Sequence, residues 1–134
     1  MSLKEIIHFE NLSDERSELT SFESNRNMPF ELKRVYCLSR LNNKKPRGFH
    51  AHKTLQQIAV CLKGGCRFVL DDGNVREELW LDSPRSGLLL KAMVWHEMHD
   101  FTNDCVMLVL ANEFYDESDY IRSYDEFLKV AQHA

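Results

Sequence analysis

Short strand-like segments separated by tight-turn signals constrain the fold of this chain more than any other feature. Residues 57–63 and 67–71 are mostly apolar, and Gly64-Gly65 joins them. Asp72-Gly73-Asn74 then marks a hairpin, because Asp-Gly accepts the positive φ of a tight turn. Similar segments recur at a spacing of about ten residues, over residues 33–38, 75–81, 88–95 and 105–111. This order favours an antiparallel sandwich or barrel.

The end of the chain carries a helix signal. Ser123 stands three residues before Glu126, which is the spacing of a capping box. Phe127, Leu128 and Ala131 then recur at helical spacing. The expected fold class is therefore all-β: an antiparallel jelly-roll barrel of cupin type, with a short C-terminal helix packed against it.

Length and composition limit the possible functions. A chain of 134 residues suffices for one domain, expected over residues 1–134. The net charge of −4 argues against non-specific binding of nucleic acid. No apolar run approaches the roughly 20 residues of a membrane helix. Because the start shows no signal-peptide pattern, we expect a cytoplasmic protein whose four cysteines are buried free thiols.

One motif concentrates the residues that carry chemistry. Arg47-Gly48-Phe49-His50-Ala51-His52-Lys53 sets two imidazoles one residue apart between two cations. On an extended backbone, residues i and i+2 point to the same face, so His50 and His52 should project into one space. Imidazoles titrate near neutrality and suit proton transfer or metal binding. The flanking Arg47 and Lys53 suggest an anionic ligand such as a diphosphate.

Metal binding is the weaker of these two interpretations. Cupin metal sites usually place a glutamate four or five residues after the second histidine, where this chain has Gln56 and Gln57. An amide is a poorer ligand for a transition metal than a carboxylate. A later histidine, His96 or His99, keeps a metal site open as an alternative. Acid–base catalysis by His50, His52 and His96 in a barrel mouth fits better.

Three further side chains have two interpretations each. Tyr36 could polarise a carbonyl or relay a proton, or it could be a core aromatic with a satisfied hydroxyl. Trp95 either stacks on a base or sugar, or fills the core. The charge of Lys53 either contacts the ligand or lies in solvent. The sequence leaves these alternatives open.

Taken together, these residues resemble the sugar-nucleotide 3,4-ketoisomerases, the WxcM-like branch of the cupin superfamily. The similarity runs over nearly the whole chain. Its most specific pieces are Pro29-Phe30-Glu31-Leu32-Lys33-Arg34-Val35-Tyr36, Pro46-Arg47-Gly48-Phe49-His50-Ala51-His52-Lys53, Leu70-Asp71-Asp72-Gly73-Asn74, Val94-Trp95-His96-Glu97-Met98-His99 and Asp116-Glu117-Ser118-Asp119-Tyr120-Ile121-Arg122. Because the fold alone hosts many activities, these motifs carry the resemblance.

The resemblance implies an activity. A dTDP-linked 4-keto-6-deoxy-D-glucose would become a dTDP-3-keto-6-deoxyhexose through an enediolate, without a redox cofactor or a metal. His50 would be the base and acid at carbon, with His52 and Tyr36 assisting at the oxygens. Arg47 would lie near the diphosphate, with Lys53 and Trp95 as further candidate substrate contacts. Such enzymes feed deoxyamino-sugar synthesis for bacterial surface polysaccharides.

The resemblance also bears on product and assembly. Arg16 and His96 would border the sugar, and this Arg/His combination resembles the members that give the galacto product. Ser17 follows Arg16 where the family commonly has glycine, which puts the position of Arg16 in question. The family implies a homodimer with exchanged N-terminal strands, for which residues 31–38 are suited.

Two other functions are compatible with the sequence. His50, His52 and His96 could hold the metal of a metal-dependent cupin enzyme, such as a dioxygenase or a sugar isomerase. Alternatively, the chain could be a non-catalytic module that binds a sugar nucleotide.

Overall fold

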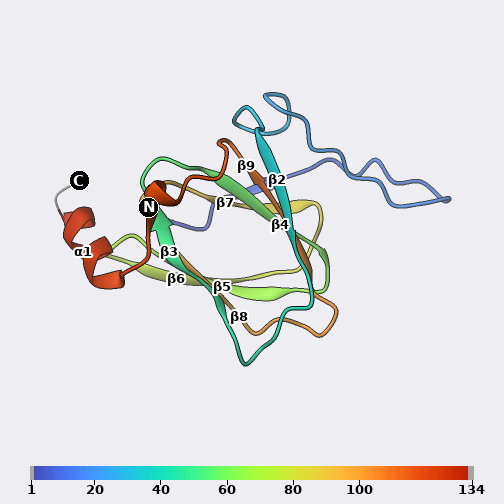
Figure 1. The fold of residues 1–134 in the computed structure, drawn as a ribbon. Coiled ribbons are helices and arrows are strands. Elements are labelled where there is room, and N and C mark those ends of the chain that lie inside the picture. The colour runs from blue at the N-terminus through green and yellow to red at the C-terminus, as the bar shows by residue number, and fades with distance from the viewer. Residues whose placement is uncertain (1, 133–134) are drawn as a thin grey trace.

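Two five-stranded antiparallel sheets face each other in the computed structural model, which describes residues 2–132 (Figure 1). One sheet has the order β1-β7-β4-β9-β2, and the other has the order β10-β3-β8-β5-β6. The strands are β1 Ile6–His8, β2 Arg34–Leu38, β3 Arg47–His52, β4 Gln57–Lys63, β5 Cys66–Asp71, β6 Arg76–Leu81, β7 Ser86–Leu90, β8 Trp95–His99, β9 Val106–Ala111 and β10 Tyr120–Ile121. The expected all-β barrel is confirmed.

One expected strand is wrong. The segment 88–95 is two strands, because β7 ends at Leu90 and β8 begins at Trp95, and the two lie in different sheets. Met93 in the connection takes a left-handed φ of 63°, a conformation that a strand does not contain. The apolar run hid this turn, since Lys91 is its one polar residue.

The main core lies between the two sheets, where alternate side chains of each strand meet. β4 is buried along its first five residues because it lies at the centre of its sheet. A smaller cluster, which includes Phe9, Phe30 and Ile58, covers the outer face of that sheet. These two clusters pack against both faces of this sheet, so the strands hold the inward-pointing side chains in fixed positions.

The C-terminal helix α1 spans Tyr124–Gln132 and packs on the outside of the other sheet. Phe127 is fully buried there against Ala51 and Trp95. The backbone N–H of Glu126 donates to the Ser123 hydroxyl at 3.3 Å, which is the capping contact that the sequence predicts. Between them, α1 and a short 3-10 helix, η1 Glu117–Asp119, place the end of the chain beside β3.

The cysteines divide into two groups. Cys61, Cys66 and Cys105 are buried free thiols, as expected, whereas Cys37 is exposed. The expectation for Cys37 is wrong because β2 is an edge strand and Cys37 lies on its outward-facing side. No helix within residues 2–132 has the length and apolar character that crossing a membrane requires.

The segment between β1 and β2 extends away from the barrel (Figure 1). It contains an isolated bridge between Asp14 and Ser17. Arg16 lies in this turn with its side chain 84% exposed, and its guanidinium contacts the Asp14 carboxylate at 2.6 Å. Arg16 is therefore remote from the core of its own chain.

Candidate active site

A cavity of about 490 Å³ opens between the two sheets. Its wall combines β2, β3, β4, β8 and β9 with side chains from the segment that precedes α1. Of the residues predicted for the site, the wall includes Tyr36, Arg47, His50 and His96. Within residues 2–132, Arg16, His52, Lys53 and Trp95 lie outside this wall.

A bulge in β3 aims His50 into the cavity. Gly48 has a φ of 87° and Phe49 a φ of 60°, and the register with β8 shifts between Gly48 and His50. A Cβ at Gly48 would lie 2.8 Å from the backbone oxygen of His96, so only glycine fits this approach. Beyond the bulge, His50 lies directly opposite His96. Bulges of this kind re-aim side chains beside active sites.

His50 has the properties of a general base. Its Nδ1 lies 3.0 Å from the carbonyl oxygen of Gly48, so Nδ1 carries the proton and donates to that oxygen. Nε2 then holds the lone pair, and it has no hydrogen-bond partner among the described residues. Burial lowers the pKa of His50 to about 4, so the ring is neutral near pH 7.

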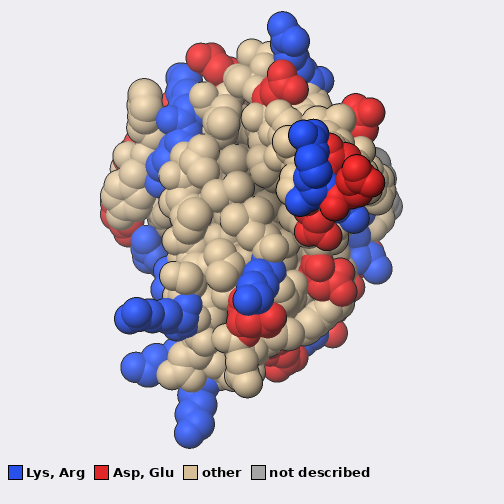
Figure 2. Space-filling model, turned by 90° about the vertical axis from the view of Figure 1, so that its right-hand side faces the viewer, with Lys and Arg blue, Asp and Glu red and all other residues tan. Residues whose placement is uncertain are grey.

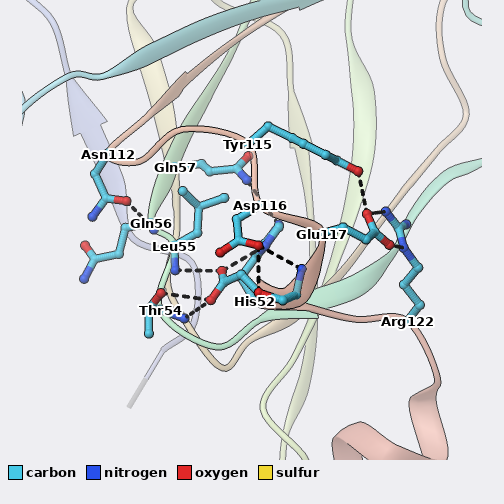
Figure 3. Close-up of polar contacts among 12 residues, drawn as sticks. His52, Thr54, Leu55, Gln56, Gln57, Asn112, Tyr115, Asp116, Glu117 and Arg122 are labelled. Carbon is cyan, nitrogen blue, oxygen red and sulfur yellow. Dashed lines mark hydrogen bonds and ion pairs between the residues drawn. The ribbon is translucent and has the colours of Figure 1, made fainter.

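His52 lies behind the cavity wall. Its side chain is 4% exposed, and its Nε2 lies 3.2 Å from the amide nitrogen of Gln57 (Figure 3). Nδ1 lies 3.4 Å from Oδ2 of Asp119, a poorly aligned contact with the one carboxylate that it faces within residues 2–132. Burial and the neighbouring His50 lower the pKa of His52 to about 4.

Asp119 is held by the loop that follows β3. Its carboxylate accepts hydrogen bonds from the backbone N–H and hydroxyl of Thr54, at 3.0 and 2.8 Å, and from the backbone N–H of Leu55 at 3.1 Å. Burial opposes the ionisation of Asp119, but these hydrogen bonds outweigh it and keep its pKa below the usual value. Asp119 is therefore an anion beside His52.

Tyr36 combines the two interpretations that the sequence left open. Its ring lines the cavity, and its hydroxyl is satisfied, because it donates to Oε1 of Gln57 at 2.8 Å. Burial and the nearby Tyr120 raise the pKa of Tyr36 to about 12. The phenol is therefore neutral near pH 7 and acts as a hydrogen-bonding group.

β8 sends its successive side chains to opposite faces. His96 points inward, and burial together with His50 and His52 lowers its pKa well below the usual value. Trp95 points outward, with its ring centroid 5.2 Å from that of Tyr124, and its Nε1 donates to Glu97 at 2.9 Å. For Trp95, the core interpretation matches its position in this chain.

The cavity wall carries three arginines. Arg122 is bound to the Glu117 carboxylate by hydrogen bonds of 2.7 and 2.9 Å (Figure 3). Arg34 and Arg47 form no ion pair within residues 2–132, and the Nε of Arg34 is buried without a partner there. These two guanidinium groups are available to an anionic ligand.

Lys53, the other cation of the motif, has an exposed side chain, and its backbone N–H donates to the carbonyl of Asp119 at 2.9 Å. Sequence reasoning missed Arg34, although it stands two residues before Tyr36 on one strand and so faces the same way.

The donor atoms of His50, His52 and His96 do not converge as metal ligands do. Within residues 2–132, one trio of potential ligands brings its donor atoms within 4.8 Å of one another, and this trio is Cys61, Cys66 and Cys105 in the core. The ring centroids of His52 and His96 are 6.2 Å apart. The cavity geometry favours proton transfer between neutral groups over metal coordination by these imidazoles.

A jelly-roll barrel whose cavity joins neutral imidazoles to available arginines defines a cupin-type site for acid–base chemistry on an anionic molecule. The chain matches the family described as WxcM-like, C-terminal, over residues 2–132, and it belongs to that family. A curated relative, the TDP-4-oxo-6-deoxy-alpha-D-glucose-3,4-oxoisomerase of Aneurinibacillus thermoaerophilus, is 55% identical over 124 residues, or 92% of this chain and 89% of the relative.

Solved structures agree with this membership. The sugar 3,4-ketoisomerase of Thermoanaerobacterium thermosaccharolyticum in complex with TDP superposes with a TM-score of 0.94 at 40% identity, covering 96% of this chain and 94% of that one. A histidine-to-asparagine variant of that enzyme, in complex with TDP-4-keto-6-deoxyglucose, gives a TM-score of 0.95 at 38% identity, covering 99% and 96%.

Proposed function

We propose that this protein is a sugar-nucleotide 3,4-ketoisomerase that converts dTDP-4-keto-6-deoxy-D-glucose into a dTDP-3-keto-6-deoxyhexose. It is an isomerase of the WxcM-like family, whose relative and structural neighbours bear the names of this reaction. The observation that carries the proposal within this chain is His50, whose Nδ1 is held by Gly48 while Nε2 keeps its lone pair beside the cavity.

His50 is the base and acid at carbon. The ketone at C4 acidifies the C3 hydrogen, so Nε2 of neutral His50 removes this proton and leaves an enediolate. The imidazolium formed at His50 then returns a proton to C4. The hydroxyl proton moves from O3 to O4, so a ketone remains at C3 and the reaction is balanced without an oxidant or a reductant.

Tyr36 and His52 support the reaction at the oxygens in different ways. Tyr36 lines the cavity, and we assign it to direct contact with the sugar oxygens. His52 contacts Gln57 and Asp119 and lies outside the cavity wall, so it acts on the substrate through neighbouring side chains and not by direct contact. His96 borders the sugar from β8, opposite His50.

Arg47 holds the diphosphate, together with Arg34. Both guanidinium groups line the cavity, and neither is neutralised by a carboxylate within residues 2–132. Arginine suits this role because its planar fork binds phosphate oxygens bidentately. Lys53 and Trp95 lie outside the wall, so any contact of theirs with substrate would need a change of position or a second subunit.

The functional protein is a homodimer with exchanged N-terminal strands. The segment before β2 supports this, because it leaves the barrel and exposes Leu12 and Leu19. Figure 2 shows the face toward which the segment extends, with mostly uncharged atoms at its centre and Lys and Arg along one side. β2 pairs with β9 of its own chain, and exchange would form the same register between two chains.

The dimer gives Arg16 its role. Arg16 is exposed far from its own cavity wall, so in the exchanged dimer it borders the sugar in the partner's cavity. With His96, it directs the return of the proton to the face of C4 that gives 3-keto-6-deoxygalactose. We infer a single cytoplasmic domain that acts in deoxyamino-sugar and surface-polysaccharide synthesis.

Conversion of the substrate tests the proposed function. Purified protein is incubated with dTDP-4-keto-6-deoxyglucose, and the sugar resonances are followed by NMR. The proposal expects the C4 ketone to be replaced by a C3 ketone, with galacto configuration at C4. Binding without conversion would support the non-catalytic alternative, and conversion that requires an added divalent metal would support the metal-dependent one.

A further inference from the structure

Four side chains form one continuous line of polar contacts, in which Tyr36 and Gln57 line the cavity and His52 and Asp119 lie behind its wall. The hydroxyl of Tyr36 lies 2.8 Å from Oε1 of Gln57, and Nε2 of Gln57 lies 3.2 Å from Nε2 of His52. Nδ1 of His52 faces the Asp119 carboxylate at 3.4 Å, which is an ion-pair distance without hydrogen-bond alignment. Gln57 is 2% exposed and His52 is 3% exposed, so no bulk water competes for these contacts.

The anionic end fixes the direction of every contact in this line. Thr54 and Leu55 donate to the Asp119 carboxylate, which accepts hydrogen bonds only. The His52 nitrogen that faces it therefore carries the proton, which leaves a lone pair on Nε2 of His52. That lone pair requires a donor, so the NH₂ group of the Gln57 amide faces His52 and the Gln57 carbonyl oxygen faces Tyr36. A carbonyl oxygen accepts only, and the phenol must donate to it.

This direction limits what Tyr36 offers to a ligand. A neutral phenol has one proton, and here that proton is committed to Gln57. Toward the cavity, Tyr36 can present only the lone pairs of its oxygen. It therefore accepts a hydrogen bond from a hydroxyl group of the sugar and does not donate one to the ketone.

We propose that Gln57 is a positioning residue of the isomerase site, which holds His52 in the form protonated on Nδ1 and makes Tyr36 a hydrogen-bond acceptor for a sugar hydroxyl. The proposal rests on the proposed function for its substrate. Gln57 stands where cupin metal sites usually have a glutamate ligand. Its contacts with Tyr36 and His52 give it a different role. One amide bridges two residues of the reaction centre and satisfies both.

The first test reads the histidine directly and requires no turnover. The protein is labelled with ¹⁵N-histidine, and long-range ¹H–¹⁵N spectra are recorded near pH 7 without ligand. The His52 signals are identified by their loss in a His52→Asn variant. The proposal expects His52 to carry one proton, on Nδ1. A proton on Nε2, or on both nitrogens, would overturn it. This result stands whether or not the protein turns over the sugar, so it separates the positioning role from the proposed function.

The second test compares two neighbouring glutamines. Gln57→Met keeps an unbranched side chain of similar length but removes both hydrogen bonds. Gln56→Met makes the same change at an adjacent position whose side chain points away from His52 (Figure 3). The expected result is a kcat roughly 10- to 100-fold lower for Gln57→Met, with TDP affinity and KM within about threefold of the wild type. Gln56→Met should leave kcat unchanged.

Two outcomes contradict the positioning role. A kcat for Gln57→Met within about twofold of wild type would show that the contacts do not matter for the reaction. An equal loss in Gln56→Met would show a general effect on the strand. If Gln57→Met does not fold, as judged by circular dichroism, the protonation of His52 in the wild-type protein decides the question.

Discussion

His50 and His96 face each other across the ladder of β3 and β8, with ring centroids 4.6 Å apart. A charge on either ring would disfavour a charge on the other, and both rings are desolvated. Two imidazoles in this relationship stay neutral at neutral pH. Proton removal from carbon requires a neutral His50. The position of His96 beside it therefore favours the form of His50 that acts as the base.

The pH dependence of turnover follows from the pKa of His50. A base with a pKa of about 4 remains neutral, and therefore active, as the pH falls from 7 to 5. We expect kcat/KM to be nearly constant over this range and to fall only as the pH approaches 4. Initial rates measured immediately after dilution from pH 7 check this. An acid limb centred near 6.5, the ordinary histidine value, would contradict the assignment.

Stability should respond to acid at a higher pH than turnover does. Unfolded histidines bind protons below about pH 6.5, whereas folded His50 and His52 do so only near pH 4. Between these values the unfolded state binds more protons, so the free energy of unfolding decreases as the pH falls. Urea unfolding at pH 7, 6 and 5 should show a falling midpoint, and a His8→Gln variant, altered at the exposed end of β1, should keep this trend. A constant or rising midpoint would argue against buried neutral histidines.

Arg47 should matter for binding of the nucleotide. Replacing it with methionine removes a charge-assisted contact to phosphate, so the Kd for TDP should rise by about 10- to 100-fold. Lys63→Met, an equal charge change at the exposed end of β4, is the matched control. Isothermal titration calorimetry with TDP measures both. Equal affinities for Arg47→Met and Lys63→Met would place the diphosphate elsewhere.

The product should depend on Arg16 and His96 together. In an Arg16→Tyr/His96→Arg variant, the pair becomes the combination that resembles the gluco type, so the proton should return to the opposite face of C4. NMR coupling at C4 reports the configuration, and light scattering should give twice the mass of one chain for both proteins. A galacto product from the variant, or a monomer, would count against the role of Arg16 in a partner's cavity.

The barrel was accessible from the sequence because alternation and turn residues are local signals. Residues 57–63 were predicted with the observed bounds of β4. The two short strands β1 and β10 were not recognised, since three and two residues carry no pattern of their own. They are strands because a neighbouring strand pairs with them.

The cavity was predictable only in part. The motif placed His50, His52, Arg47 and Lys53 in one group, and the rings of His50 and His52 do lie together, with centroids 4.9 Å apart. Arg47 and His50 lie on the wall, whereas His52 lies behind it and Lys53 is exposed. The contact between His52 and Asp119 depends on the chain folding back through β10, and no spacing in the sequence links the two residues. Gln57 was interpreted through the ligand that it replaces, because its partners become visible only in three dimensions.

The role of His50 can be tested by the source of the hydrogen at C4. Wild-type protein and His50→Asn are incubated with dTDP-4-keto-6-deoxyglucose in deuterated water, with TDP binding measured in parallel. The wild type should form the 3-keto isomer with deuterium at C4 and none at C5. His50→Asn should bind TDP normally and turn over about 100- to 10,000-fold more slowly. Deuterium at C4 appearing equally fast in His50→Asn would contradict the assignment of His50 as the base at carbon.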